Sequence, residues 1–165
     1  MTGYNFRWID DKVAGSHRPT KEELEIYKRT GINTIVCLQT CDDVETIGSG
    51  DYPLYSPAEA REMDIDFIHI PVPDQTPPLD DQFEAFVTLA MEPGRKTAVH
   101  CFSGTGRTGC MLAAYLAIAY DLSPTEAINR LRAMFYPYIA TPEQELGTRD
   151  WIERHNRNKK KTRTH

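Results

Sequence analysis

The clearest structural signal in the chain is residues 97–109, TAVHCFSGTGRTG. A short β-branched run ends at His100 and an apolar run of helix length begins near Arg107, so the pattern predicts a buried strand, a tight loop and a helix. Gly104 and Gly106 allow the backbone amides of the loop to turn inward, and the N-terminus of the helix adds positive potential. The loop is therefore predicted to bind an anion of the size of phosphate.

Cys101 opens this loop, and Arg107 follows six residues later. A thiol that is surrounded by amides at a helix N-terminus is driven toward the thiolate. Arginine can hold two phosphate oxygens side by side, and Thr108 places a hydroxyl where it could donate to the sulfur. A buried structural cysteine would explain Cys101 alone. The pattern C-x5-R-T, with glycines inside it and between a strand and a helix, instead favours a nucleophile that attacks phosphate.

A thiolate that attacks a phosphoester needs an acid to protonate the leaving oxygen. Asp74 is the best candidate, because it follows a predicted strand in the proline-rich stretch 70–78, IPVPDQTPP. An ordinary turn residue is the alternative, since Asp is common in such loops. Asp66, Asp80 and Asp81 also compete, although strand alternation explains Asp66 and an N-cap explains Asp80.

The rest of the chain alternates short apolar runs with amphipathic segments of helix length. Strands are expected over 12–15, 33–38, 66–70 and 97–100. Helices are expected to begin near 20, 56, 123 and 141, where Ser or Thr is followed three residues later by Glu or Gln, and two more are expected at about 80–91 and 107–120. This order predicts an α/β fold with a central, mostly parallel sheet flanked by helices, and a site at the carboxyl ends of the strands.

Length and charge set further limits. A chain of 165 residues is about one domain, and its net charge is −5. Six basic residues follow Glu153, so the body before them carries −11, which excludes nucleic-acid binding over the whole surface. Residues 157–165 are predicted to be a basic, disordered tail. The first twenty residues show no targeting signal, and the apolar run 110–120 is too short to cross a bilayer.

Taken together, these motifs resemble the cysteine-dependent protein phosphatases, in particular the small dual-specificity group with its VHZ-like and archaeal members. The resemblance covers most of residues 4–152. It includes Asn5-Phe6-x-Trp8, the VAG run at 13–15, the Pro-Val-Pro-Asp loop, the phosphate loop and ATPEQE at 140–145. It implies the fold of the phosphotyrosine protein phosphatases and a single phosphatase domain over residues 1–156.

The resemblance also implies roles for individual residues. Cys101 would be the nucleophile that forms a cysteinyl-phosphate, and Arg107 would bind the phosphate and its transition state. Asp74 would be the general acid and then the general base. Thr108 would stabilise the thiolate, and His100 would stiffen the loop and support the thiolate. The backbone amides that would hold the phosphate oxygens belong to Phe102, Ser103, Gly104, Thr105, Gly106 and Arg107.

Two further residues are candidates for substrate binding. In the family a glutamine at the position of Gln144 can place the hydrolytic water, but Gln144 also lies three residues after Thr141, and capping ranks slightly ahead. The family's Arg-Pro-Gly run is replaced here by residues 135–138, FYPY. One hypothesis is that Tyr136 or Tyr138 lines the pocket mouth and favours aryl phosphates. The alternative is a helix end that packs on the core.

The function that follows is a metal-independent and cofactor-free phosphatase. Its expected substrate is phosphotyrosine in a protein or peptide, extending to phosphoserine or phosphothreonine if the pocket is shallow. A non-protein phosphate monoester (a nucleotide, sugar phosphate or lipid head group) and a binding module without turnover are the alternatives. The uncharged side chains of Phe102, Ser103 and Thr105 argue against polyphosphates.

The sequence also gives expectations about the protein's setting. We expect a cytoplasmic monomer, or a nuclear one in a eukaryote, with no nucleic-acid partner and no membrane span. The four cysteines form no C-x-x-C pair, which favours free thiols in a reducing compartment. A disulfide from Cys101 to Cys41 or Cys37 is chemically reasonable, although an inert cysteine is the favoured interpretation.

Overall fold

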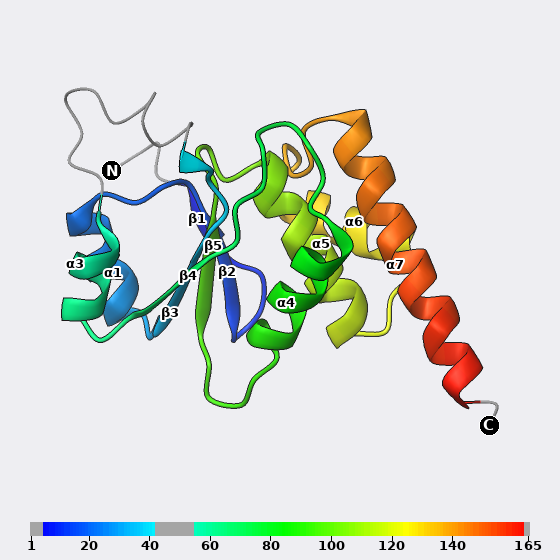
Figure 1. The fold of residues 1–165 in the computed structure, drawn as a ribbon, viewed down its shortest axis with the longest axis horizontal. Coiled ribbons are helices and arrows are strands. Elements are labelled where there is room, and N and C mark those ends of the chain that lie inside the picture. The colour runs from blue at the N-terminus through cyan, green and yellow to red at the C-terminus, as the bar shows by residue number, and fades with distance from the viewer. Residues whose placement is uncertain (1–4, 42–54, 164–165) are drawn as a thin grey trace.

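The computed structural model describes residues 5–41 and 55–163, which form a five-stranded sheet between two layers of helices (Figure 1). The strands are β1 (Phe6–Trp8), β2 (Val13–Ser16), β3 (Thr34–Cys37), β4 (Asp66–His69) and β5 (Thr97–His100). Their order across the sheet is β1-β2-β5-β3-β4, and only the β1–β2 pair is antiparallel. This architecture confirms the predicted α/β fold. No sequence pattern predicts β1, because three half-buried residues are too few to show a period.

Helices cover both faces of the sheet (Figure 1). They are α1 (Lys21–Arg29), α3 (Pro57–Glu62), α4 (Asp80–Ala90), α5 (Gly106–Ala119), α6 (Pro124–Met134) and α7 (Pro142–Arg163). Ala14, Ile35 and Ala98 pack toward α1 and α3, while the residues beside them in β2, β3 and β5 pack toward α5. Because these three strands are buried on both faces, they appear in the sequence as continuous apolar runs without alternation.

Local capping chemistry sets the helix starts. Thr20, Ser56 and Ser123 each accept a hydrogen bond from a backbone amide three residues on, and the glutamate there returns the bond. The start of α4 differs from the expectation for Asp80. Leu79 is the N-cap residue, and its backbone amide donates to the side-chain oxygen of Gln82. The carboxylate of Asp80 does not cap the helix and pairs with Arg154 of α7.

α7 continues through Arg163, so residues 157–163 of the basic segment that was expected to be disordered are helical. Lysine and arginine are good helix formers, and cations are favourable near a helix C-terminus. Tertiary contacts extend beyond residue 154: Asn156 Nδ2 donates to the Leu122 carbonyl at 3.1 Å, and Lys159 pairs with Asp121 at 3.4 Å. Within the described ranges, no helix combines the length and the apolar character needed to cross a membrane.

Candidate active site

The phosphate loop, residues 101–106, connects the end of β5 to the start of α5 at the carboxyl ends of the parallel strands. Gly104 has a φ of +80°, and a β-carbon there would lie 2.5 Å from the backbone carbonyl of Ser16. Only glycine satisfies both the dihedral angle and the close approach of β2. The sequence therefore fixes the path of the loop at this residue.

Asn5 holds the outer side of the phosphate loop. Its Nδ2 donates to the carbonyls of Ser103 at 2.8 Å and Gly104 at 3.5 Å. In a trans peptide the N–H points opposite to the C=O, so these bonds turn the amides of Gly104 and Thr105 away from Asn5. Asn5 belongs to a motif that carries the family resemblance, but the sequence pattern alone gave it no role.

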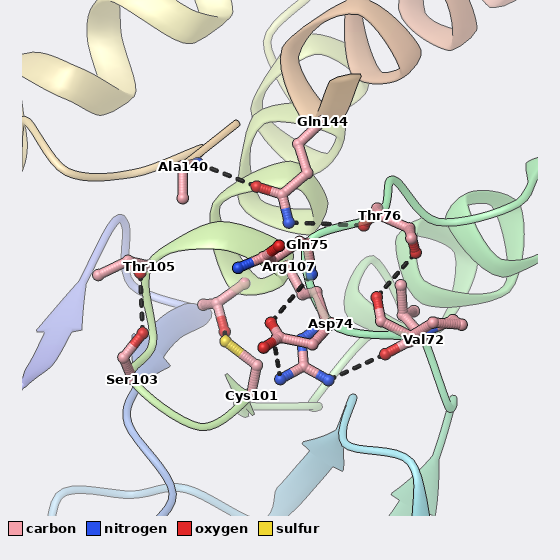
Figure 2. Close-up of polar contacts among 12 residues, drawn as sticks. Val72, Asp74, Gln75, Thr76, Cys101, Ser103, Thr105, Arg107, Ala140 and Gln144 are labelled. Atoms are coloured by element: carbon pink, nitrogen blue, oxygen red, sulfur yellow. Dashed lines mark hydrogen bonds and ion pairs between the residues drawn. The ribbon is translucent and has the colours of Figure 1, made fainter. Parts of the chain in front are cut away.

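The nucleophile candidate lies under the loop. Cys101 is 2% exposed, and its Sγ accepts a hydrogen bond from Thr108 Oγ1 at 3.1 Å (Figure 2). Thr108 is fully buried. The predicted pair of thiol and hydroxyl is thus in contact, and a donor already faces the sulfur that would carry negative charge.

His100 supports the loop as a neutral side chain. Its Nδ1 lies 2.9 Å from the Cys101 carbonyl, and its Nε2 lies 2.6 Å from the hydroxyl of Tyr55. A carbonyl only accepts, so Nδ1 carries the proton and Nε2 accepts from Tyr55. Burial lowers the pKa of His100 to about 3, so its support for the loop comes from hydrogen bonds and not from charge. No sequence pattern predicts the partnership with Tyr55, which is 45 residues away.

Arg107 brings the acid loop to the phosphate loop. The guanidinium is 2% exposed, donates from Nη1 to the Val72 carbonyl at 2.9 Å, and lies 3.4 Å from Asp74 Oδ1 through Nη2 (Figure 2). Asp74 itself is exposed and accepts a further bond from the Gln75 amide. Asp66 pairs with Arg95 at the start of β4, which is the amino end of the parallel strands and lies opposite the site. Of the rival carboxylates, Asp66 and Asp80 are therefore engaged elsewhere.

Gln144 caps α7 and also lies against both loops. Its Oε1 accepts from the amides of Ala140 at 3.0 Å and Thr141 at 3.1 Å, and its Nε2 lies 3.5 Å from the Thr76 carbonyl (Figure 2). A β-carbon at Gly106 would lie 2.9 Å from the side-chain amide. This geometry is that of a residue that caps the N-terminus of α7, as the sequence pattern indicates. Contact between Gln144 and a substrate stays a prediction.

Tyr138 does not line the pocket mouth, which corrects the hypothesis for this residue. Its side chain is fully buried and meets the Phe135 ring edge-on at 5.1 Å. The chain turns inward after α6 because Arg132 binds the carbonyls of Tyr138 at 3.0 Å and Ile139 at 3.1 Å. Tyr136 is 83% exposed. For Tyr138 the packed helix end is the correct interpretation.

The cysteines are free thiols. Cys37 and Cys101 are buried and Cys41 is exposed. Cys37 ends β3, where Arg18 Nη1 lies 3.9 Å from its sulfur. A disulfide to Cys101 under oxidation stays an untested alternative to the inert cysteine that the sequence favours.

The fold and this pair of loops define a class of protein, the phosphatases with a cysteine-initiated phosphate loop. The family model of the Swiss Army Knife protein, DSP-PTPase phosphatase domain (PTP-SAK), matches residues 4–148. The chain belongs to this family of tyrosine and dual-specificity protein phosphatases, which are hydrolases.

Three known proteins illustrate the relationship. The chain is 32% identical over 168 residues to Protein tyrosine phosphatase domain-containing protein 1 of Mus musculus, covering 93% of this chain but 22% of that protein. The chain thus spans about a fifth of the length of this relative. It superposes on Tk-PTP in the active form with a TM-score of 0.80 and 27% identity, over 91% of this chain and 97% of the other. It superposes on PTPMT1 in complex with PI(5)P with a TM-score of 0.80 and 17% identity, over 93% and 97% of the two chains, a likeness of fold alone.

Proposed function

We propose that this protein hydrolyses phosphotyrosine in proteins or peptides through a cysteinyl-phosphate intermediate on Cys101. The observation that carries the proposal is that Arg107 contacts Asp74 at 3.4 Å while Thr108 donates to the Cys101 sulfur at 3.1 Å. A nucleophile, an anion-binding guanidinium and an acid thus meet at one loop. Cys101 and Arg107 come from the phosphate loop and the start of α5, whereas Asp74 comes from the loop after β4. The fold therefore brings the acid to the other two groups.

The first step transfers the phosphoryl group. The Cys101 thiolate attacks phosphorus, an S–P bond forms, and the bond from phosphorus to the ester oxygen breaks. Asp74 donates its proton to that oxygen, which leaves as the hydroxyl of tyrosine. Arg107 and the amides of residues 102–106 hold the remaining phosphate oxygens as charge develops on them.

The second step frees the enzyme. A water molecule attacks the cysteinyl-phosphate, and Asp74, now a carboxylate, takes its proton. The S–P bond breaks with its electron pair on sulfur. Thr108 Oγ1 donates to that sulfur and stabilises the thiolate as it leaves. Neither step requires a metal or a cofactor.

The rim of the loop supports a substrate with one phosphate on an aromatic group. The side chains of Phe102, Ser103 and Thr105 carry no charge, so they offer nothing to a second phosphate. Phe102 is 48% exposed beside the nucleophile, where its ring can contact an aryl ester. A lipid or nucleotide monoester is the second candidate class, and a substrate panel distinguishes it.

The test is hydrolysis of para-nitrophenyl phosphate against pH in the presence of EDTA. We expect a bell-shaped profile for the wild type and no turnover for Cys101→Ser. Asp74→Asn should lose the basic limb of this profile, because the group that must stay protonated is gone. Asp81→Asn, a control on the exposed side of α4, should keep the wild-type profile.

Two results would refute the mechanism, namely activity that survives Cys101→Ser and activity that EDTA abolishes. A panel of phosphotyrosine, phosphoserine and phosphothreonine peptides with a phosphoinositide then tests the substrate. Preference for the phosphoinositide would refute the protein substrate while leaving the chemistry intact.

A further inference from the structure

We propose that the start of α7 positions the general acid, so that Thr141, just before the helix, and Gln144 and Gly147 in its first two turns hold the Asp74 loop over Cys101 before substrate arrives. The proposal rests on the proposed function, since it assigns Asp74 a proton to deliver. It concerns positioning residues, because none of the three needs to touch the phosphate.

Three consecutive residues of the acid loop meet Thr141, which precedes α7, and Gln144 and Gly147 inside it. Thr141 Oγ1 donates to the Gln75 carbonyl at 3.3 Å, and Gln144 Nε2 donates to the Thr76 carbonyl at 3.5 Å. The third contact is steric: a β-carbon at position 147 would lie 2.6 Å from Cβ of Pro77 and 2.8 Å from its Cγ. The spacing 141, 144, 147 places these residues on one face of a helix.

The other side of the loop is also held. Arg107 Nη1 donates to the Val72 carbonyl at 2.9 Å. Thr76 closes a tight turn around Asp74, because its amide and its hydroxyl both donate to the Pro73 carbonyl, at 3.2 and 2.7 Å. Asp74 is thus the tip of a turn that is tied to Arg107 at one end and to α7 at the other (Figure 2).

Gly147 is the informative residue of the three. Thr141 and Gln144 also form the N-terminal cap of α7, so their presence has a purely structural explanation. Glycine inside a helix destabilises it relative to alanine. The glycine at 147 is explained by Pro77, which packs where a side chain would stand.

The test is Gly147→Ala, whose methyl group must displace Pro77 and with it Asp74. Phenyl phosphate has a poor leaving group and needs the acid, whereas para-nitrophenyl phosphate needs it much less. We expect kcat/KM to fall roughly 10- to 100-fold on phenyl phosphate and by much less on the nitrophenyl ester. Inhibition by inorganic phosphate, which reports on the phosphate loop, should not change. Leu146→Ala, an exposed neighbour in the same helix, should leave both rates at the wild-type level.

Pro77→Gly is the second variant, because it removes the same contact and leaves α7 intact. It should show the same selective loss on phenyl phosphate even if Gly147→Ala folds poorly. Adding Gly147→Ala to Pro77→Gly should cost nothing further, since the clash is gone.

The outcomes separate the two proposals. An active wild type whose Gly147→Ala and Pro77→Gly variants hydrolyse both esters at the wild-type rate would overturn the positioning role alone. Equal losses on both esters together with weaker phosphate inhibition would also overturn it, because the damage would lie in the phosphate loop. A wild type that is inactive on both esters would overturn the proposed function and this inference with it.

Discussion

At the scale of single residues, the site depends on which groups carry charge. His100 stays neutral because burial holds its pKa near 3, so the sulfur of Cys101 receives no cationic support from the preceding residue. The Cys101 sulfur instead accepts a hydrogen bond from the side chain of Thr108, whose Oγ1 lies 3.1 Å away. Hydrogen bonds to charged groups are worth about 1.5–3 kcal/mol, which is roughly 10- to 150-fold in rate. Thr108 should therefore matter most when the thiolate is the leaving group.

The residue-scale prediction is that Thr108→Val slows turnover about 10- to 100-fold, because valine fills the same space without a donor. The cysteinyl-phosphate should accumulate, since its breakdown loses the stabilised leaving group. Rapid quenching with intact-protein mass spectrometry measures that species. Thr108→Ser keeps the hydroxyl and serves as the control. Equal slowing by both variants would show that packing against Thr108, and not its hydrogen bond, is what counts.

At the scale of elements, the phosphate loop is held by neighbours that lie far away in the sequence. Asn5, the residue before β1, donates to the loop, and β2 supplies the backbone against which Gly104 packs. The helix starts at 20, 56, 123 and 141 were predictable because a capping box is a local pattern of four residues. β1 was not, because its three residues are too few to show a period, and the Asn5 and Tyr55 contacts were not, because each joins residues that lie far apart in the sequence.

The element-scale prediction concerns this support. Asn5→Ala removes the donor to the carbonyls of Ser103 and Gly104, so the loop amides should be less well ordered. Inorganic phosphate should then inhibit about 2- to 10-fold more weakly, the effect of one ordinary hydrogen bond. Asn33→Ala is a matched control, because Asn33 donates to the Gly94 carbonyl at 2.9 Å at the amino ends of the parallel strands, away from the site. An unchanged inhibition constant for Asn5→Ala would show that the loop keeps its shape without the Asn5 side-chain hydrogen bonds.

At the scale of the whole molecule, the sheet and α5 are joined at the end opposite the active site. Asp10 lies between β1 and β2, and its Oδ2 accepts from Tyr115 of α5 at 2.6 Å and from Tyr120 at 2.8 Å. Its Oδ1 accepts from the amides of Lys12 and Val13, both at 2.8 Å. Sequence patterns predicted both the sheet and the helix α5 that this network joins. The network itself, like the burial of Tyr138, connects positions that no local pattern relates.

This network should make stability depend on pH. Burial acts to raise the pKa of Asp10, but the hydrogen bonds from Tyr115, Lys12, Tyr120 and Val13 outweigh it, and the pKa is lowered. A carboxylate with a lowered folded-state pKa stabilises the fold above its unfolded-state pKa. That stabilisation is lost as the pH falls through the folded value.

We therefore expect Asp10→Asn to lower the free energy of unfolding by roughly 1–3 kcal/mol at pH 7, because charge-assisted bonds become neutral ones. Since asparagine does not titrate, the difference in the free energy of unfolding between the wild type and Asp10→Asn should shrink as the pH falls below about 4. Urea denaturation at a series of pH values measures this difference. Hydrolysis of para-nitrophenyl phosphate at low temperature should be unaffected, because Asp10 lies at the far end of the sheet. A difference that stays constant from pH 7 to pH 3 would mean that the charge of Asp10 adds nothing to the fold and that only the shape of its side chain matters.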